Sequence, residues 1–441
     1  MPDGTSAKQG PSSAGARQGP GGAAPPQGSA TATGAPGASG TQGAGSGRPG
    51  HPAVVLAPPG APVPPRAASD QATRDRRAVA LWLIAVAAMV WIMVALGGAT
   101  RLGGSGLSIM EWAPLSGAIP PVSDAEWQRL FDLYRTIPQY ALVNQGFGIE
   151  GFKSIFWLEW THRLWGRLIG LVFAGGLVWF WARGRVPAGL KPRLVLLLIL
   201  GGLQGAVGWF MVASGFEADS TAVSPWRLVI HLALALLLYS VLVWTAMTLR
   251  HPEREATPGA RPLRALAHPV AGLVVLTMLA GGFVAGIKAG LDYNTFPLMD
   301  GHLVPEGYFF LEPAWRNLFE NVASVQFNHR LLATVTLLLV LVTAGLGLAR
   351  LPAGRARRWC ALLGLAALAQ YGLGVSTLIH GVPFALGTLH QSVAVAVLTA
   401  ALGTMHALRR PRGAAATVPA VAAASPAAPG APPARAAAVG R

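Results

Sequence analysis

The sequence predicts an all-α integral membrane protein whose eight transmembrane helices form two tandem four-helix bundles. The first indication is composition: the 441 residues are 52% hydrophobic and only 12% charged, whereas soluble domains carry roughly 25% charged residues. The second is the continuity of the apolar runs, which excludes the alternating pattern of a membrane β-barrel. The third is an internal repeat that divides the apolar runs into two sets of four.

Each apolar run is close to the roughly 20 residues that a helix needs to cross a bilayer. We expect helices at 78–97, 159–182, 194–213, 227–249, 269–287, 329–349, 359–378 and 387–408. On either side, residues 1–73 and 411–441 are rich in Gly, Ala and Pro and poor in large apolar side chains. Such segments bury too little surface to offset the entropy of ordering, so we expect two disordered tails.

Basic residues alternate between the connections. Arg and Lys gather at 183–193, 250–264 and 350–358, before the first helix and after the last one, whereas the connection at 214–226 carries acidic residues. Basic connections stay on the cytoplasmic side, so both termini are expected in the cytoplasm. The net charge of +16 is thereby explained as a topology signal. We expect the lipid bilayer as a partner and no nucleic acid.

The repeat orders the whole chain. Residues 159–164 (EWTHRL) are echoed at 326–331 (QFNHRL), and residues 204–208 (QGAVG) at 370–374 (QYGLG). Four helices separate the copies. Because four is an even number, both copies have the same orientation, which predicts a pseudo-twofold axis along the membrane normal. We therefore expect an N-terminal half at 74–250 and a C-terminal half at 251–410.

Four histidines recur with this repeat: His162 and His231 in the first half, His329 and His390 in the second. The topology places all four at one level, within the first turn or two of their helices. Two histidines on facing helices can hold a porphyrin iron from opposite sides. The alternative for a lone intramembrane histidine is a hydrogen bond between helices, but four in repeat-related pairs favour two haem sites.

Arg163 and Arg330 directly follow two of these histidines. An arginine at this depth needs a partner, and haem propionates are good bidentate partners for a guanidinium. The alternative is that each side chain extends to the lipid headgroups. We expect both arginines to bind propionates.

The one informative difference between the copies is Glu159 against Gln326, each three residues before a histidine. A carboxylate beside a haem can relay protons or stabilise positive charge, and an amide does neither comparably. The alternative is a carboxylate that only accepts hydrogen bonds at a helix N-terminus. If the sites have diverged, the first half carries the chemistry and the second transfers electrons.

These residues resemble the haem A synthase family, in the branch found in proteobacteria and mitochondria. The resemblance covers 78–408 and includes EWTHRLWGR at 159–167, FNHR at 327–330 and the two later histidines. It implies an oxidoreductase that acts on a CH group, oxidising the ring D methyl group of haem O to a formyl group. The product would be haem A for cytochrome oxidase assembly.

Residue by residue, the resemblance implies that His162 and His231 are the ligands of the substrate haem. His329 and His390 would be the axial ligands of a bound haem B, and Glu159 would be required for catalysis. The resemblance also implies two partners, a haem O synthase and an electron donor. The Gram-positive branch has a cysteine pair in the first outer connection, and this chain has none there, since its single cysteine is Cys360.

Two other functions are compatible with parts of the pattern. A di-haem cytochrome b-type protein that only transfers electrons would need the same histidines. A transporter is suggested by the duplication alone and predicts no haem. The Gly- and Pro-rich leader favours the bacterial cytoplasmic membrane over the mitochondrial inner membrane.

Overall fold

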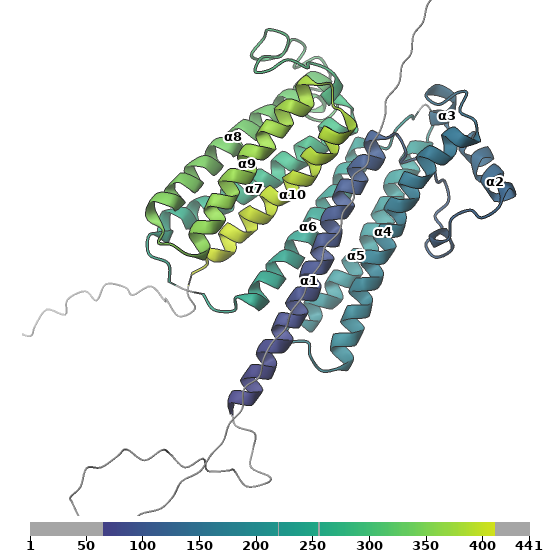
Figure 1. Cartoon of the computed structure of the whole chain (residues 1–441). Coiled ribbons are helices and arrows are strands. Elements are labelled where there is room, and N and C mark those ends of the chain that lie inside the picture. The colour runs from purple at the N-terminus through teal and green to yellow at the C-terminus, as the bar shows by residue number, and fades with distance from the viewer. Residues whose placement is uncertain (1–64, 219, 255, 411–441) are drawn as a thin grey trace, which may run out of the picture. The chain divides into compact units, whose positions relative to one another are not determined.

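Eight long helices make up most of the structure, a computed structural model that describes residues 65–410 except 219 and 255. They are α1 (Pro65–Leu102), α4 (Ile149–Ala182), α5 (Lys191–Ala213), α6 (Pro225–Arg250), α7 (Ala260–Gly286), α8 (Val322–Arg350), α9 (Arg355–Ile379) and α10 (Phe384–Ala407). All eight are long and apolar enough to cross a membrane. The predicted fold class is therefore confirmed (Figure 1).

The ends of the first two long helices differ from the prediction. Residues 65–73, expected in the N-terminal tail, belong to α1; the rest of that tail and the tail at 411–441 lie outside the described residues. Helix α4 begins at Ile149 instead of 159 because Phe152 and Phe156 pack on aromatic side chains of the preceding connection. His162 therefore lies thirteen residues into its helix and not in the first two turns.

The long helices pack in two cycles of four. In the first half, α1 contacts α4 and α6, and α5 contacts α4 and α6. In the second half, α7 contacts α8 and α10, and α9 contacts α8 and α10. Figure 1 shows α7 to α10 lying side by side, with α1, α4, α5 and α6 in the other group. Exchanging the halves maps each contact onto its counterpart, as two copies of one bundle would require.

The halves meet along α1, α6, α7 and α10. Helix α1 contacts α10, α6 contacts α7, and α6 also contacts α10. Buried Leu236 and Leu242 of α6 and Leu398 of α10 belong to one apolar core that includes residues of both halves. A hydrogen bond of 2.7 Å between the hydroxyls of Tyr239 and Thr399 crosses this interface. Polar side chains in an apolar bundle need such a partner between helices.

The first long connection folds into a helical cap. It contains the short helices η1 (Ser116–Ala118), α2 (Asp124–Tyr134) and α3 (Pro138–Leu142). Ser123 caps α2 by accepting a hydrogen bond from the Glu126 amide, which satisfies one free N–H at the helix start. Trp127 and Phe131 then pack onto Phe152 and Phe156 of α4, so α2 is fixed to the end of the first half at which α4 begins.

The second long connection forms a cap without a long helix. It contains η3 (Ala289–Leu291) and η4 (Ala314–Leu318). Fully buried Asn317 accepts from the Leu311 amide and donates to the Leu311 carbonyl, which closes the loop on itself. In Figure 1 this connection lies at the same end of the helices as α2 and α3.

Candidate functional site

The four histidines lie on four different long helices, and each packs against a glycine of the preceding long helix. The contacts are His162 (α4) with Gly97 (α1), His231 (α6) with Gly208 (α5), His329 (α8) with Gly281 (α7) and His390 (α10) with Gly374 (α9). A Cβ atom on any of these glycines would lie only 2.8–3.1 Å from the ring Cε1. A larger residue would therefore have to displace the imidazole. The same contact occurs four times, twice in each half.

The structure brings the histidines together in the predicted pairs. His162 and His231 are close enough for a charge on one to act on the other. The same is true of His329 and His390. Each pair lies on the second and fourth long helices of one half. These are α4 and α6 in the first half, and α8 and α10 in the second.

A glutamine accompanies one histidine of each pair. Gln204 Nε2 lies 3.2 Å from each ring nitrogen of His231. In the second half, Gln370 Nε2 lies 3.2 and 3.5 Å from the ring nitrogens of His390. The sequence analysis gave these glutamines no role, although the repeated QxxxG pattern that contains them was visible. Their amides restrict the orientation of the rings beside them.

Glu159 lies in a closed network of hydrogen bonds. The residue is 2% exposed. Its Oε2 accepts from the Ser108 hydroxyl at 2.8 Å and from the Ile109 amide at 2.9 Å. Its Oε1 accepts from Arg163 Nε at 2.9 Å. A buried carboxylate is stable only when it is paired and hydrogen-bonded in this way.

Gln326 occupies the equivalent position in the second half, with an amide in place of the carboxylate. It is also 2% exposed. Its Oε1 accepts from Arg330 Nη2 at 2.8 Å, and its Nε2 donates to the carbonyls of Ala289 and Asp292 at 2.6 and 2.5 Å. The amide thus donates to the second cap, whereas the Glu159 carboxylate accepts from the first. The two copies share the link to an arginine and differ in the direction of the hydrogen bonds to the cap and in whether the group can ionise.

Arg163 and Arg330 hold the caps. Arg163 donates to the carbonyls of Glu111 and Ile109 at 2.9 and 2.6 Å. Arg330 donates to the Thr295 carbonyl at 2.9 Å and to the Tyr293 carbonyl. The buried Nε of Arg330 has no partner among the described residues. The propionate role of both arginines stays a prediction, and cap attachment is a role that the sequence did not reveal.

Two more arginines of the membrane helices, Arg101 and Arg167, were not among the residues predicted for the sites. Arg101 of α1 donates to the Ala285 carbonyl of α7 and so links the two halves. Arg167 donates to the carbonyls of Pro114 and Ala113 at 2.9 and 2.7 Å. Within the described part of the chain, Arg101 Nε and Arg167 Nη1 are buried without a partner. Buried donors of this kind suit an anionic group.

The residues present fit two haem groups. The Nδ1 atoms of His162 and His329 are buried without a protein partner in the described structure. Glycine on the facing helix leaves each imidazole room beside the backbone. Over residues 65–410 without 219 and 255, no three His, Cys, Asp or Glu side chains gather to hold a bare metal ion. Histidines arranged in facing pairs suit the two axial positions of a porphyrin iron instead.

Comparison with known proteins agrees with this arrangement. Residues 80–402 match the family model COX15-CtaA, described as cytochrome oxidase assembly protein. A protein of Granulibacter bethesdensis named Heme A synthase is 58% identical over 336 residues, which are 76% of this chain and 88% of that protein. The chain belongs to the haem A synthase family. The resemblance noted from the sequence motifs is therefore confirmed.

Other members of the haem A synthase family are similar over the same region. The Heme A synthase of Rhodospirillum centenum is 46% identical over 79% of this chain and 92% of its own length. That of Azorhizobium caulinodans is 48% identical over 76% of this chain and 95% of its own length. The similarity thus spans nearly the whole of these relatives.

Proposed function

We propose that this chain is a haem A synthase, an oxidoreductase that converts the ring D methyl group of haem O into the formyl group of haem A. The observation that carries the proposal is a pair of equivalent histidine sites in which, among the described residues, only the first half has a buried carboxylate. Relatives with the name Heme A synthase, at 46–58% identity, support the same activity.

His162 and His231 hold the substrate haem O, whose apolar farnesyl tail favours entry from the bilayer. Glu159, which is buried, lies one turn before His162 on α4. Its Oε1 is held by Arg163 and its Oε2 by Ser108 and Ile109. From this fixed position it takes up protons that the methyl group loses or stabilises positive charge that develops there.

His329 and His390 hold haem B as a resident cofactor. When bound, haem B supplies an iron that takes up and releases single electrons. Gln326 keeps this site without an ionisable group, which suits electron transfer and not proton transfer. Arg163, and Arg330 with its unpartnered Nε, bind the propionates while they hold the caps.

The protein works in the bacterial cytoplasmic membrane, with both termini in the cytoplasm. The eight apolar helices and the bacterial relatives support this location. A haem O synthase supplies its substrate, and a redox partner exchanges electrons with it.

The test is expression of the full-length chain in a bacterium that makes haem O but lacks a haem A synthase. Haem A should appear in acid–acetone extracts of the membranes, and the purified protein should contain haem B. A protein that binds haem while haem O stays unconverted would instead be a cytochrome b-type electron-transfer protein. A protein without haem would contradict both haem functions and would favour the alternative of a transporter.

A further inference from the structure

Part of the first cap lies along the side of α4 and not above its end. In this part, segment 109–119, two carbonyls accept from Arg163. One turn further along α4, Arg167 accepts no such limit and donates to the carbonyls of Ala113 and Pro114 at 2.7 and 2.9 Å. Four residues of a helix span about 6 Å, so the segment descends beside α4 by that distance. Figure 1 shows this stretch of chain beside α4, before α2 begins.

The depth of Arg167 in the bilayer follows from the length of α4. The helix has 34 residues, whereas about 20 residues cross the hydrocarbon layer. Near its last residue, Ala182, Arg183 lies 4.8 Å from the ring of Trp179. Aromatic and basic side chains of this kind mark a membrane boundary. About 20 residues before Ala182, the other boundary falls near His162, so Arg167 lies about one turn inside the apolar layer.

The segment exposes large apolar side chains at this depth. Leu115 is 87% exposed and Ile119 is 72% exposed. On α4, Leu171 is 69% exposed and lies one turn beyond Arg167. Residues four apart lie on the same face of a helix. The exposed surface of Leu171 therefore continues the apolar surface of the segment toward the middle of the bilayer.

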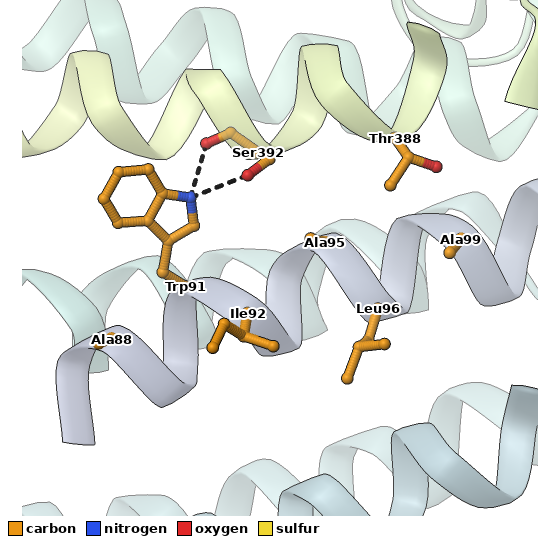
Figure 2. Close-up of a pocket in the computed structure, with 8 residues that line it drawn as sticks. All are labelled: Ala88, Trp91, Ile92, Ala95, Leu96, Ala99, Thr388 and Ser392. Atoms are coloured by element: carbon orange, nitrogen blue, oxygen red, sulfur yellow. Dashed lines mark hydrogen bonds between the residues drawn. The ribbon is translucent and has the colours of Figure 1, made fainter. Parts of the chain in front are cut away.

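A lipid-accessible surface elsewhere in the molecule shows the difference. Between α1 and α10 an apolar groove of about 430 Å³ is open to the membrane, and Ile92 on its edge is 46% exposed (Figure 2). Across it, Trp91 Nε1 donates to the Ser392 carbonyl at 2.9 Å. All of its lining side chains belong to two membrane helices. Segment 109–119 instead exposes apolar side chains from a connection between helices.

The backbone of the segment is hydrogen-bonded where it lies deepest. The Gly117 amide donates to the Ala113 carbonyl at 3.1 Å. The Ala118 amide donates to the Leu115 carbonyl, also at 3.1 Å. A Cβ on Gly117 would lie 2.8 Å from Arg167 Nη2, so glycine allows the turn to approach the guanidinium. Irregular backbone is tolerated at membrane depth only with such pairing.

In the second half, the residue equivalent to Arg167 does not hold the cap. The repeat aligns Arg163 with Arg330 and Arg167 with Thr334. Thr334 shares a hydrogen bond of 3.0 Å with the Tyr371 hydroxyl of α9, and its side chain makes none to the second cap in the described structure. The deeper attachment is therefore a feature of the first half and does not follow from the duplication.

We propose that segment 109–119 is re-entrant, and that its apolar side chains lie among the acyl chains of one leaflet beside α4. Arg167 holds it at this depth by pairing carbonyls that lipid would leave unpaired. Trp112 stacks on Trp209 of α5 at 6.2 Å, which attaches the segment to a second helix. Its partner is lipid and not a soluble protein, because Leu115 follows directly on the carbonyls that Arg167 holds inside the apolar layer.

The experiment measures the depth of an NBD fluorophore on a single cysteine of the full-length protein, in vesicles of phosphatidylcholine and phosphatidylglycerol. Cys360→Ala provides the background, since Cys360 is the only cysteine of the chain. The label is attached at Leu115→Cys. Leu171→Cys is the lipid-facing reference, and Asp132→Cys, whose side chain is 55% exposed on α2 of the same cap, is the water-facing reference. Doxyl-labelled phosphatidylcholine quenches a label among the acyl chains.

The label at 115 should emit at a shorter wavelength than that at 132 and be quenched nearly as strongly as that at 171. Emission and quenching at 115 equal to those at 132 would place the segment in water and overturn the proposal. Short-wavelength emission without quenching would show that protein, such as a second copy of the chain, covers the segment, and would overturn it as well.

Arg167→Leu tests what holds the segment at this depth. The label at 115 should then lose its quenching, because the carbonyls of Ala113 and Pro114 lose their donor and leave the apolar layer. Arg183→Leu, at the opposite end of α4, is the control and should not change the quenching. Unchanged quenching in Arg167→Leu would contradict the role of Arg167. The haem content of each variant, measured separately, shows whether the bundle is intact.

Discussion

Glu159 and Arg163 are joined by a hydrogen bond of 2.9 Å on one turn of α4, and both also hold the backbone of Ile109 in the first cap. Gln326 and Arg330 make the same connection in the second half at 2.8 Å. Both halves keep the link from this side chain to the arginine and to the cap, but the carboxylate accepts hydrogen bonds from the first cap and the amide donates to the second. The first half therefore differs from the second both in charge and in the polarity of the cap that this side chain contacts.

Glu159→Gln should lower haem A formation by about 100-fold or more, the usual size of a general acid–base contribution. Haem binding should persist, because the amide oxygen can still accept from Arg163 and the amide nitrogen can donate to the Ser108 hydroxyl. Haem O and haem A in membrane extracts, together with the absorption spectrum, measure the two effects. Glu150→Gln changes an exposed carboxylate of the same helix, is the control, and should leave haem A formation in place. If Glu159→Gln makes haem A normally, the carboxylate has no catalytic role.

Gly374→Ala should reduce the haem bound in the second half, because its Cβ would lie 2.8 Å from His390 Cε1 and would push the ring away. Gly372→Ala is the control on the same helix, since a Cβ there meets no atom within 4 Å. The haem-to-protein ratio of the two purified variants checks the prediction. Equal haem content in both would mean that the glycine is not needed to seat His390.

Arg330→Leu should loosen the second cap. The substitution removes the donors to the carbonyls of Tyr293 and Thr295 and to Gln326. Each lost hydrogen bond costs about 1 kcal/mol, so hydrogen exchange in residues 288–321 should accelerate at least tenfold. Arg358→Leu, at the opposite end of the bundle, should not change that exchange. An unaltered second cap in Arg330→Leu would show that other contacts suffice to hold it.

The ion pair of Arg129 and Glu111 should make the stability of α2 depend on pH. Their hydrogen bond lowers the pKa of the Glu111 carboxyl from its ordinary value. The stabilisation is therefore present above the unfolded pKa of about 4.3 and is lost as the pH falls through the lower folded pKa. Both side chains are 46% exposed, so screening limits the effect to at most about 1 kcal/mol.

Arg129→Ala should consequently speed hydrogen exchange in residues 124–134 at pH 7 and have a smaller effect at pH 3, below the ordinary pKa of a Glu carboxyl. The ratio of variant to wild-type exchange at each pH is the measurement. A ratio that stays the same at both values would mean that Arg129 acts through packing and not through the carboxylates.

The number of helices, the paired histidines and the contrast of Glu159 with Gln326 could all be predicted from the sequence. Membrane helices are encoded locally, by the length of an apolar run. The duplication adds long-range information, because an alignment of the two halves shows which of their positions are equivalent. His162 and His231 could be paired for that reason before any contact was known.

The contacts around these residues could not be predicted, because they join segments far apart in the chain. The sequence gives no sign that Gly97 contacts His162, or that Arg330 contacts the carbonyls of the preceding connection. The start of α4 at Ile149 is a similar case, since it depends on aromatic packing against α2. Such contacts depend on side-chain direction and on helix packing, which an apolar run does not specify.

By itself, then, the sequence determined what the protein contains: eight membrane helices in two related halves, four histidines and one unmatched carboxylate. The tertiary structure decided how these are held, with glycine against each imidazole and an arginine on each cap. It also decided where the halves differ in packing, with Arg167 holding part of the first cap beside α4 where the equivalent Thr334 bonds to Tyr371. The physical reason is that a repeat fixes which residues correspond, whereas packing fixes which of them touch.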